Sequence, residues 1–105
     1  MLTRLRRGRL RTPDSAPDAG EEVVELLSHR NLVVEQILSG PGDGPVEYLQ
    51  EQDEWVVVLA GGAGMTVGGI PVELGAGDWV FLPARVPHAV LWADPGTSWL
   101  AVHLR

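Results

Sequence analysis

The sequence predicts a single domain of the all-β class, and three observations favour it. Short apolar runs rich in Val and Ile recur from residue 31 onward, and runs of this length and composition indicate β-strands. Turn-forming residues separate them closely, with 13 Gly and 8 Pro in 105 residues. No stretch after residue 31 is typical of a helical crossover, which disfavours a parallel α/β sheet.

The strands are predicted in order from the apolar runs and the turns between them. Eight are expected, at residues 32–38, 46–49, 54–60, 65–67, 70–74, 79–82, 88–92 and 98–104. The pair Gly68-Gly69 suits a two-residue hairpin turn. Ahead of these strands, residues 21–27 carry apolar side chains that fit either a short helix or an edge strand. Both interpretations stay open.

Charge divides the chain into two parts. Five of the eight Arg lie within the first eleven residues, and residues 12–20 contain Pro and small polar residues. We therefore expect a flexible basic tail and linker over residues 1–20 and a domain over residues 21–105. From residue 12 onward, three Arg face fourteen acidic residues, so the domain repels phosphate and no nucleic-acid partner is expected for it.

Several classes of protein are disfavoured by composition. The chain has no Cys, which excludes disulfide scaffolds, zinc–thiolate sites and a Cys nucleophile. No apolar run approaches the roughly 18 residues that a membrane helix needs. The basic start also lacks the apolar segment of a secretory signal. The sequence therefore predicts a cytoplasmic protein with no membrane partner.

The run from residue 77 to 92 is the most specific part of the sequence. A Gly-Asp turn leads into an apolar strand, Pro83 ends it, and a loop delivers His88 to the next strand. This arrangement resembles the second sequence motif of the cupin superfamily, in which Gly77, Pro83 and His88 are in register. Arg85 stands where that motif has a Gly, and Trp92 stands where it has an Asn.

An earlier run resembles the first cupin motif. Gly42, Glu54 and Gly61 keep its spacing, but Tyr48 and Gln50 stand where the motif has its two histidines. The resemblance covers about residues 21–105 and is nearest to small single-domain bacterial cupins of the RmlC-like type. It implies a double-stranded β-helix, which is a jelly-roll barrel with room for one small ligand.

The resemblance also implies where a site lies. Residues two apart on a strand face the same way, so Tyr48 and Gln50 are expected inside the barrel, where Glu54 and His88 join them. Cupins hold a divalent metal at this place. Glu54 and His88 are ordinary ligands, whereas a Gln amide is weak and a Tyr phenol suits mainly ferric iron. Two interpretations stay open: one divalent ion (Fe, Mn, Ni or Zn), or a polar pocket without metal.

Three further side chains are candidates near this site. Trp92 follows His88 by four positions on one strand, so we expect it to point inward and stack on a planar ligand. Arg85, at the rim, is expected either to capture a carboxylate ligand or to pair with a surface acid. His103 alternates with apolar residues of 100–104; if these line the core, His103 faces the surface or a dimer interface, and otherwise it is a further ligand at the site.

Three hypotheses for function follow. The first is a module that binds a small organic molecule in a pocket formed by Tyr48, Gln50, Glu54, His88, Trp92 and Arg85. The second is a metal-dependent enzyme of the dioxygenase or isomerase type, with Glu54, His88, Gln50 and Tyr48 at the metal. The third is a structural or regulatory dimer with a filled barrel. Sheet edges that need covering and four Trp favour a homodimer in each case.

Overall fold

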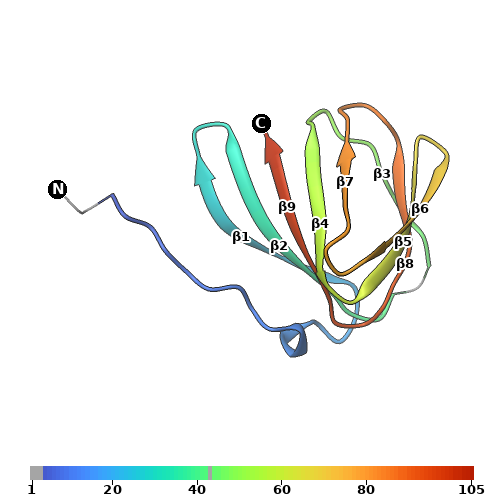
Figure 1. The fold of residues 1–105 in the computed structure, drawn as a ribbon, viewed down its shortest axis with the longest axis horizontal. Coiled ribbons are helices and arrows are strands. Elements are labelled where there is room, and N and C mark those ends of the chain that lie inside the picture. Colours follow the sequence, from blue (N-terminus) through green and yellow to red (C-terminus); the bar gives the residue numbers. More distant parts are fainter. Residues whose placement is uncertain (1–3, 43) are drawn as a thin grey trace.

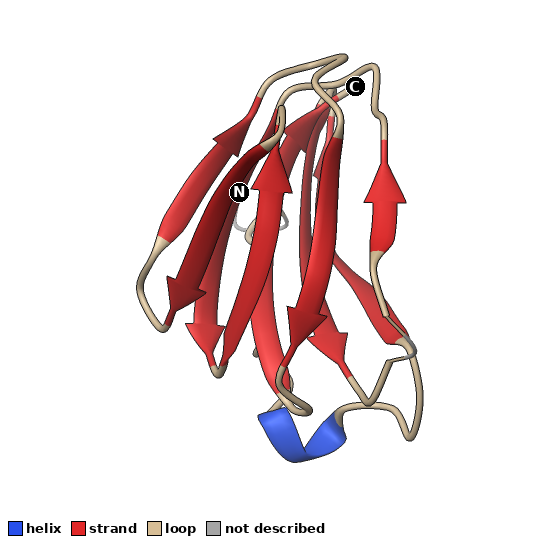
Figure 2. Cartoon of the chain, turned by 90° about the vertical axis from the view of Figure 1, so that its right-hand side faces the viewer, coloured by secondary structure: helices blue, strands red, loops and turns tan. Residues whose placement is uncertain are grey.

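The computed structural model describes residues 4–42 and 44–105 and arranges them as a sandwich of two antiparallel sheets (Figure 1). One sheet has the strand order β1-β2-β9-β4-β7 and the other β3-β8-β5-β6. Figure 2 shows the two layers, with a short 3-10 helix, η1 (Pro13–Ser15), at one end. The strands are β1 (Glu21–His29), β2 (Leu32–Ser39), β3 (Val46–Tyr48), β4 (Glu54–Ala60), β5 (Gly62–Val67), β6 (Ile70–Gly75), β7 (Trp79–Leu82), β8 (His88–Ala93) and β9 (Thr97–Leu104). The all-β prediction is confirmed.

The segment that sequence left undecided is an edge strand. β1 pairs only with β2, at one border of the five-stranded sheet. A bulge between Glu25 and Leu27 interrupts the pairing, which explains why the apolar residues of this segment do not alternate strictly. The apolar pattern of residues 21–27 fitted a helix and a strand equally. The segment forms a strand because it can pair with the edge of β2 that would otherwise be free.

The predicted hairpin turn is present between β5 and β6. Gly68 and Gly69 have φ values of 55° and 82°, and Val67 pairs directly with Ile70. Positive φ at both central residues is the geometry of a tight two-residue turn, which glycine adopts without steric strain.

The core fills the space between the two sheets. It is formed by Val56, Val58, Ala63, Met65, Leu74, Leu82, Trp99 and Ala101. Trp99 donates a hydrogen bond from Nε1 to Ser39 Oγ at 3.0 Å, so its polar edge is satisfied while its rings are buried.

The core shows how β9 is oriented, and the prediction that His103 faces the surface or a dimer interface is wrong. Trp99 and Ala101 face the core, so by alternation His103 lies on that inner face, while Leu100 and Val102 lie on the outer face. The prediction had assumed the opposite, because an apolar outer face cannot be told from a core face by periodicity.

Trp92 also lies on the other face from the one predicted. Gly64 pairs with Trp92, but the next residue of β5, Met65, pairs with Val90. Leu91 is therefore the extra residue of a bulge, and the bulge reverses the alternation of β8. Trp92 lies against Gly64 on the outside of its sheet and is 47% exposed.

The segment before β1 contacts the five-stranded sheet. The Arg11 backbone N–H donates to Gln36 Oε1 at 2.8 Å, and Gln36 Nε2 donates to the Arg11 carbonyl at 2.9 Å. The Arg11 guanidinium pairs with Glu22. The division at residue 20 and the flexibility of the tail stay predictions. Among residues 4–42 and 44–105, no helix is long and apolar enough to cross a membrane.

Candidate functional site

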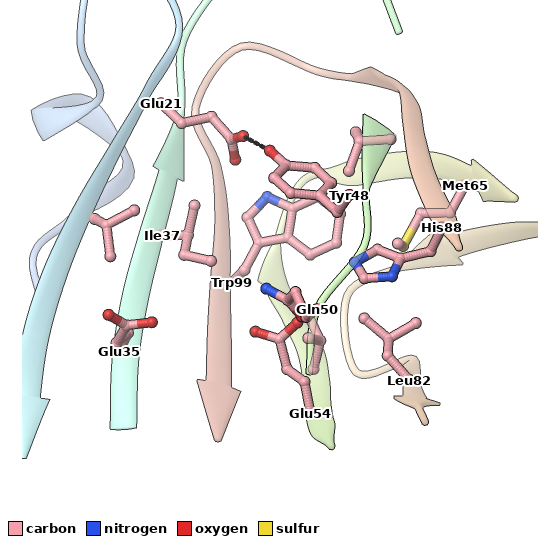
Figure 3. Close-up of a pocket in the computed structure, with 13 residues that line it drawn as sticks. Glu21, Glu35, Ile37, Tyr48, Gln50, Glu54, Met65, Leu82, His88 and Trp99 are labelled. Carbon is pink, nitrogen blue, oxygen red and sulfur yellow. Dashed lines mark hydrogen bonds between the residues drawn. The ribbon is translucent and has the colours of Figure 1, made fainter. Parts of the chain in front are cut away.

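A cavity of about 180 Å³ lies between the two sheets (Figure 3). A cavity of about 150 Å³ in another protein accepts benzene, so this space suits a small organic molecule. It is at odds with the filled barrel of the structural-dimer hypothesis. The lining residues are Glu21, Val23, Glu35, Ile37, Tyr48, Gln50, Glu54, Val56, Met65, Leu82, His88, Val90 and Trp99.

Tyr48 and His88 form one wall of the cavity. They are cross-strand partners on β3 and β8, and their rings stack with centroids 5.4 Å apart and planes 16° from parallel. The Tyr48 hydroxyl donates to Glu21 Oε1 at 2.9 Å. Burial, followed by the charge of Glu21 and this hydrogen bond, raises the pKa of Tyr48 to about 12, so the phenol stays protonated at neutral pH.

Glu54 lies at the first position of β4 and faces the inside of the sandwich, where the resemblance implied that it would lie. It is only 9% exposed and lines the cavity, and among the described residues no fully buried side-chain nitrogen or oxygen lacks a hydrogen-bond partner. Burial raises the pKa of Glu54 above its usual value; nearby His103 partly offsets this and Glu35 adds to it. Figure 3 shows the Glu54 carboxylate among the side chains that line the cavity.

Glu35 and His103 are polar groups next to Glu54 that sequence reasoning missed. His103 is the cross-strand partner of Glu54. Its Nε2 lies 2.9 Å from Glu35 Oε1, and its Nδ1 lies 3.0 Å from Gln52 Oε1. Glu35 lines the cavity, and an acid inside an apolar strand was the signal that could have revealed it. Glu21, which holds Tyr48, was missed as well because it lies on the segment of uncertain structure.

Four of the six residues predicted for the pocket line the cavity, and two do not. Tyr48, Gln50, Glu54 and His88 all line the cavity, whereas Arg85 and Trp92 lie outside it. The Arg85 Nε–H donates to Glu51 Oε2 at 2.9 Å, and both side chains are largely exposed. Arg85 thus makes the surface ion pair that was one of its two predicted roles.

The donor set fits a divalent metal poorly. Glu54 and His88 are good ligands, but the neutral Tyr48 phenol is turned to Glu21. Gln50 offers only a neutral amide oxygen, and tight sites commonly use three or four strong ligands. Within residues 4–42 and 44–105, no three His, Cys, Asp or Glu side chains are grouped so that they could hold an ion.

Comparison with known proteins finds one family model and several similar structures. The family model described as "Cupin domain" matches residues 34–103. A crystal structure of a putative mannose-6-phosphate isomerase from Ralstonia eutropha JMP134 is similar with a TM-score of 0.74 and 34% identity, over 92% of this chain and 98% of that one. No curated protein matches the chain.

Two further structures share the fold at lower identity. An RmlC-like cupin from Shewanella frigidimarina NCIMB 400 has a TM-score of 0.73 at 21% identity, over 82% of this chain and 77% of that one. The cupin domain of an XRE family transcriptional regulator from Enterobacter cloacae has a TM-score of 0.70 at 19% identity, over 82% and 97%. These likenesses concern the fold alone.

Proposed function

The chain belongs to the cupin family, and from this premise we propose that its pocket binds a small organic ligand without a tightly held metal ion. The observation that carries the proposal is the position of Tyr48. Its hydroxyl is engaged by Glu21, and its ring covers His88. One of the two positions that hold metal-binding His in other cupins is therefore used to shape the pocket.

The lining suits ligand binding because it combines apolar walls with few polar groups. Ile37, Val56 and Met65 are among the apolar wall residues. Glu54 and Gln50 present a carboxylate and an amide to the same space. In this proposal the walls exclude water and the polar groups set the orientation of the ligand.

The proposal is tested by narrowing the mouth of the pocket. Val23 lines the cavity and is 56% exposed, so Val23→Phe adds bulk at the entrance with little effect on the core. Leu26 lies on the same strand, is 38% exposed and does not line the cavity, so Leu26→Phe is the matched control.

Small-molecule binding is measured by calorimetry across a mixed library of neutral, cationic and anionic compounds. The proposal expects ligands of the wild-type protein to bind Leu26→Phe equally and Val23→Phe at least about tenfold more weakly. A library that yields no ligand, or ligands that bind both variants alike, contradicts it.

A metal-dependent enzyme of the isomerase or dioxygenase type is the second candidate. It is favoured by one observation: Glu54 and His88, the two strong ligands, line the same cavity. The similar structure at 34% identity, described as a putative mannose-6-phosphate isomerase, is compatible with it. The metal content of the purified protein separates the two candidates.

We further propose that the protein is a homodimer that associates through the outer face of the five-stranded sheet. Cross-strand partners gather six uncharged apolar side chains there, here called the outer patch: Trp55, Val57, Trp79, Phe81, Leu100 and Val102. Since the domain is strongly acidic, two copies repel least at an uncharged surface. Such a patch can meet its own copy across a twofold axis. A cytoplasmic location is a separate part of the proposal.

A further inference from the structure

We infer that the ligand of this pocket is a small organic cation, with an ammonium or guanidinium nitrogen on an apolar body. The inference rests on the proposed function and names the chemical class of its ligand. It follows from the charges that line the cavity, from the largely buried carboxylate of Glu54 that borders it, and from its apolar walls.

Negative groups dominate the charge of the lining. Three carboxylates, Glu21, Glu35 and Glu54, face the cavity, and no Arg is among its lining residues. The chain has no Lys, and Arg85 is held outside the cavity by Glu51. An anionic ligand would therefore enter a space of like charge, with no Arg or Lys to receive it.

Of the three carboxylates, Glu54 is the one best placed to bind a cationic ligand. Glu21 accepts the Tyr48 hydroxyl and Glu35 pairs with His103. Glu54 takes part in neither contact, and since no fully buried side-chain oxygen of the described residues lacks a partner, its carboxylate is either paired or open to the cavity that it lines. It is more than nine-tenths buried and borders the cavity. A buried carboxylate is costly unless it is paired, and a ligand N–H group would supply a charge-assisted hydrogen bond.

The rest of the cavity favours an organic cation over a bare ion. Its wall includes Ile37, Met65 and Leu82, which cannot coordinate a hard cation but can pack against carbon. Trp99 and Tyr48 add aromatic surface, and aromatic faces attract ammonium and guanidinium groups. With about 180 Å³ available, one ring or a short branched chain with one nitrogen fits.

The inference is tested with three probes of one shape and different charge: benzylamine, benzyl alcohol and benzoate. Each is titrated into the intact protein at neutral pH by calorimetry. Benzylamine is expected to bind at least about tenfold more tightly than either of the others. Glu54→Gln is expected to weaken benzylamine about tenfold or more, with little effect on benzyl alcohol.

Glu73→Gln is the matched control because Glu73 is an exposed acid on β6 away from the cavity; it removes the same charge and should leave benzylamine binding unchanged. Glu35→Gln provides a second test if Glu54→Gln does not fold. Equal or tighter binding of benzyl alcohol or benzoate, unchanged affinity in Glu54→Gln, or no binding of benzylamine overturns the inference. The proposed function is tested independently, by comparing ligand binding to Val23→Phe and Leu26→Phe.

Discussion

Tyr48 links the two sheets of the sandwich by stacking on His88 while donating its hydroxyl to Glu21. Tyr48 and His88 are cross-strand partners within the four-stranded sheet, whereas Glu21 opens β1 of the five-stranded sheet. The contact therefore spans one wall of the cavity. Because the phenol is fixed at both its ring and its hydroxyl, it shapes the pocket and is not free to turn toward a metal.

The titration of Tyr48 is the first prediction. Burial and the nearby Glu21 raise its pKa to about 12, and it is the only Tyr in the chain. Absorbance of the tyrosinate should therefore appear near pH 12 in the folded protein and near pH 10, the value of free tyrosine, after unfolding. Since the folded state keeps its proton longer, the free energy of unfolding should fall as the pH rises from about 10 to 12.

Glu21→Gln provides the control for this titration. It removes the charge and the charge-assisted hydrogen bond but leaves the burial of the ring, which is the largest cause of the shift. The pKa of Tyr48 in the variant should lie between 10 and about 12. A wild-type transition near pH 10 would contradict the buried, hydrogen-bonded phenol.

The second prediction concerns the pH dependence of stability through Glu54. Burial raises the pKa of this carboxyl in the folded state above its ordinary 4.5. The folded protein therefore loses stability as the pH rises from about 4.5 through that raised value; the loss is complete above it and absent well below pH 4.5. Glu54→Gln removes the charge, so it should raise Tm at pH 8 and have little effect at pH 3.5.

Thermal unfolding of Glu54→Gln and Glu73→Gln across this pH range checks the prediction. Glu73 is exposed on β6, so its variant should show no comparable gain at pH 8. If Glu54→Gln melts below the wild type at pH 8, the carboxylate is stabilised by contacts that this account lacks.

The bulge in β8 gives the third prediction. A Cβ added at Gly64 would lie 2.2 Å from Nε1 of Trp92, so Gly64→Ala should displace the ring and cost about 1–3 kcal/mol of stability. In a Trp92→Ala background the clash is gone, and the same change should be neutral or slightly stabilising. Urea unfolding of the four proteins measures the difference, and equal costs in both backgrounds would show that Trp92 does not lie over Gly64.

The fourth prediction is that the outer patch forms the dimer contact. Trp79 lies in this patch on the border strand β7 and is 61% exposed, with its ring 6.1 Å from that of Trp55. Trp79→Ser should turn a dimer into a monomer in light scattering, because it removes a large aromatic anchor. Ile70→Ser, at an equally exposed site on the other sheet, should remain dimeric. A monomeric wild-type protein, or dimeric Trp79→Ser, refutes this interface.

Most of the fold could be predicted from sequence because strand length, turn glycines and motif spacing are local properties. Tyr48, Gln50 and His88 were expected in the pocket from their positions in the two motifs, and all three line the cavity, although Gln50 lies beyond the end of β3. The expected strand over 54–60 has the same bounds as β4. These predictions succeed because each depends on a few neighbouring residues.

The errors arise where pairing between strands that are distant in sequence sets the direction of a side chain. The bulge that turns Trp92 outward depends on how β5 pairs with β8, and no local pattern in residues 88–92 predicts it. His103 was assigned to the outer face because Leu100 and Val102 looked like core residues. They instead belong to an apolar outer face, which sequence cannot distinguish from a core. The acidic character of the pocket was missed for a related reason, since Glu21, Glu35 and Glu54 come together from three different strands.

Metal content tests the central claim most directly. Untagged protein and its His88→Ala variant are each incubated with Fe, Mn, Ni and Zn, passed through a desalting column and measured by inductively coupled plasma mass spectrometry. The account of the pocket as an organic ligand site predicts far less than one metal ion per chain in both proteins. A wild-type protein that retains close to one ion per chain, lost in His88→Ala, would contradict it and favour the metal-dependent enzyme.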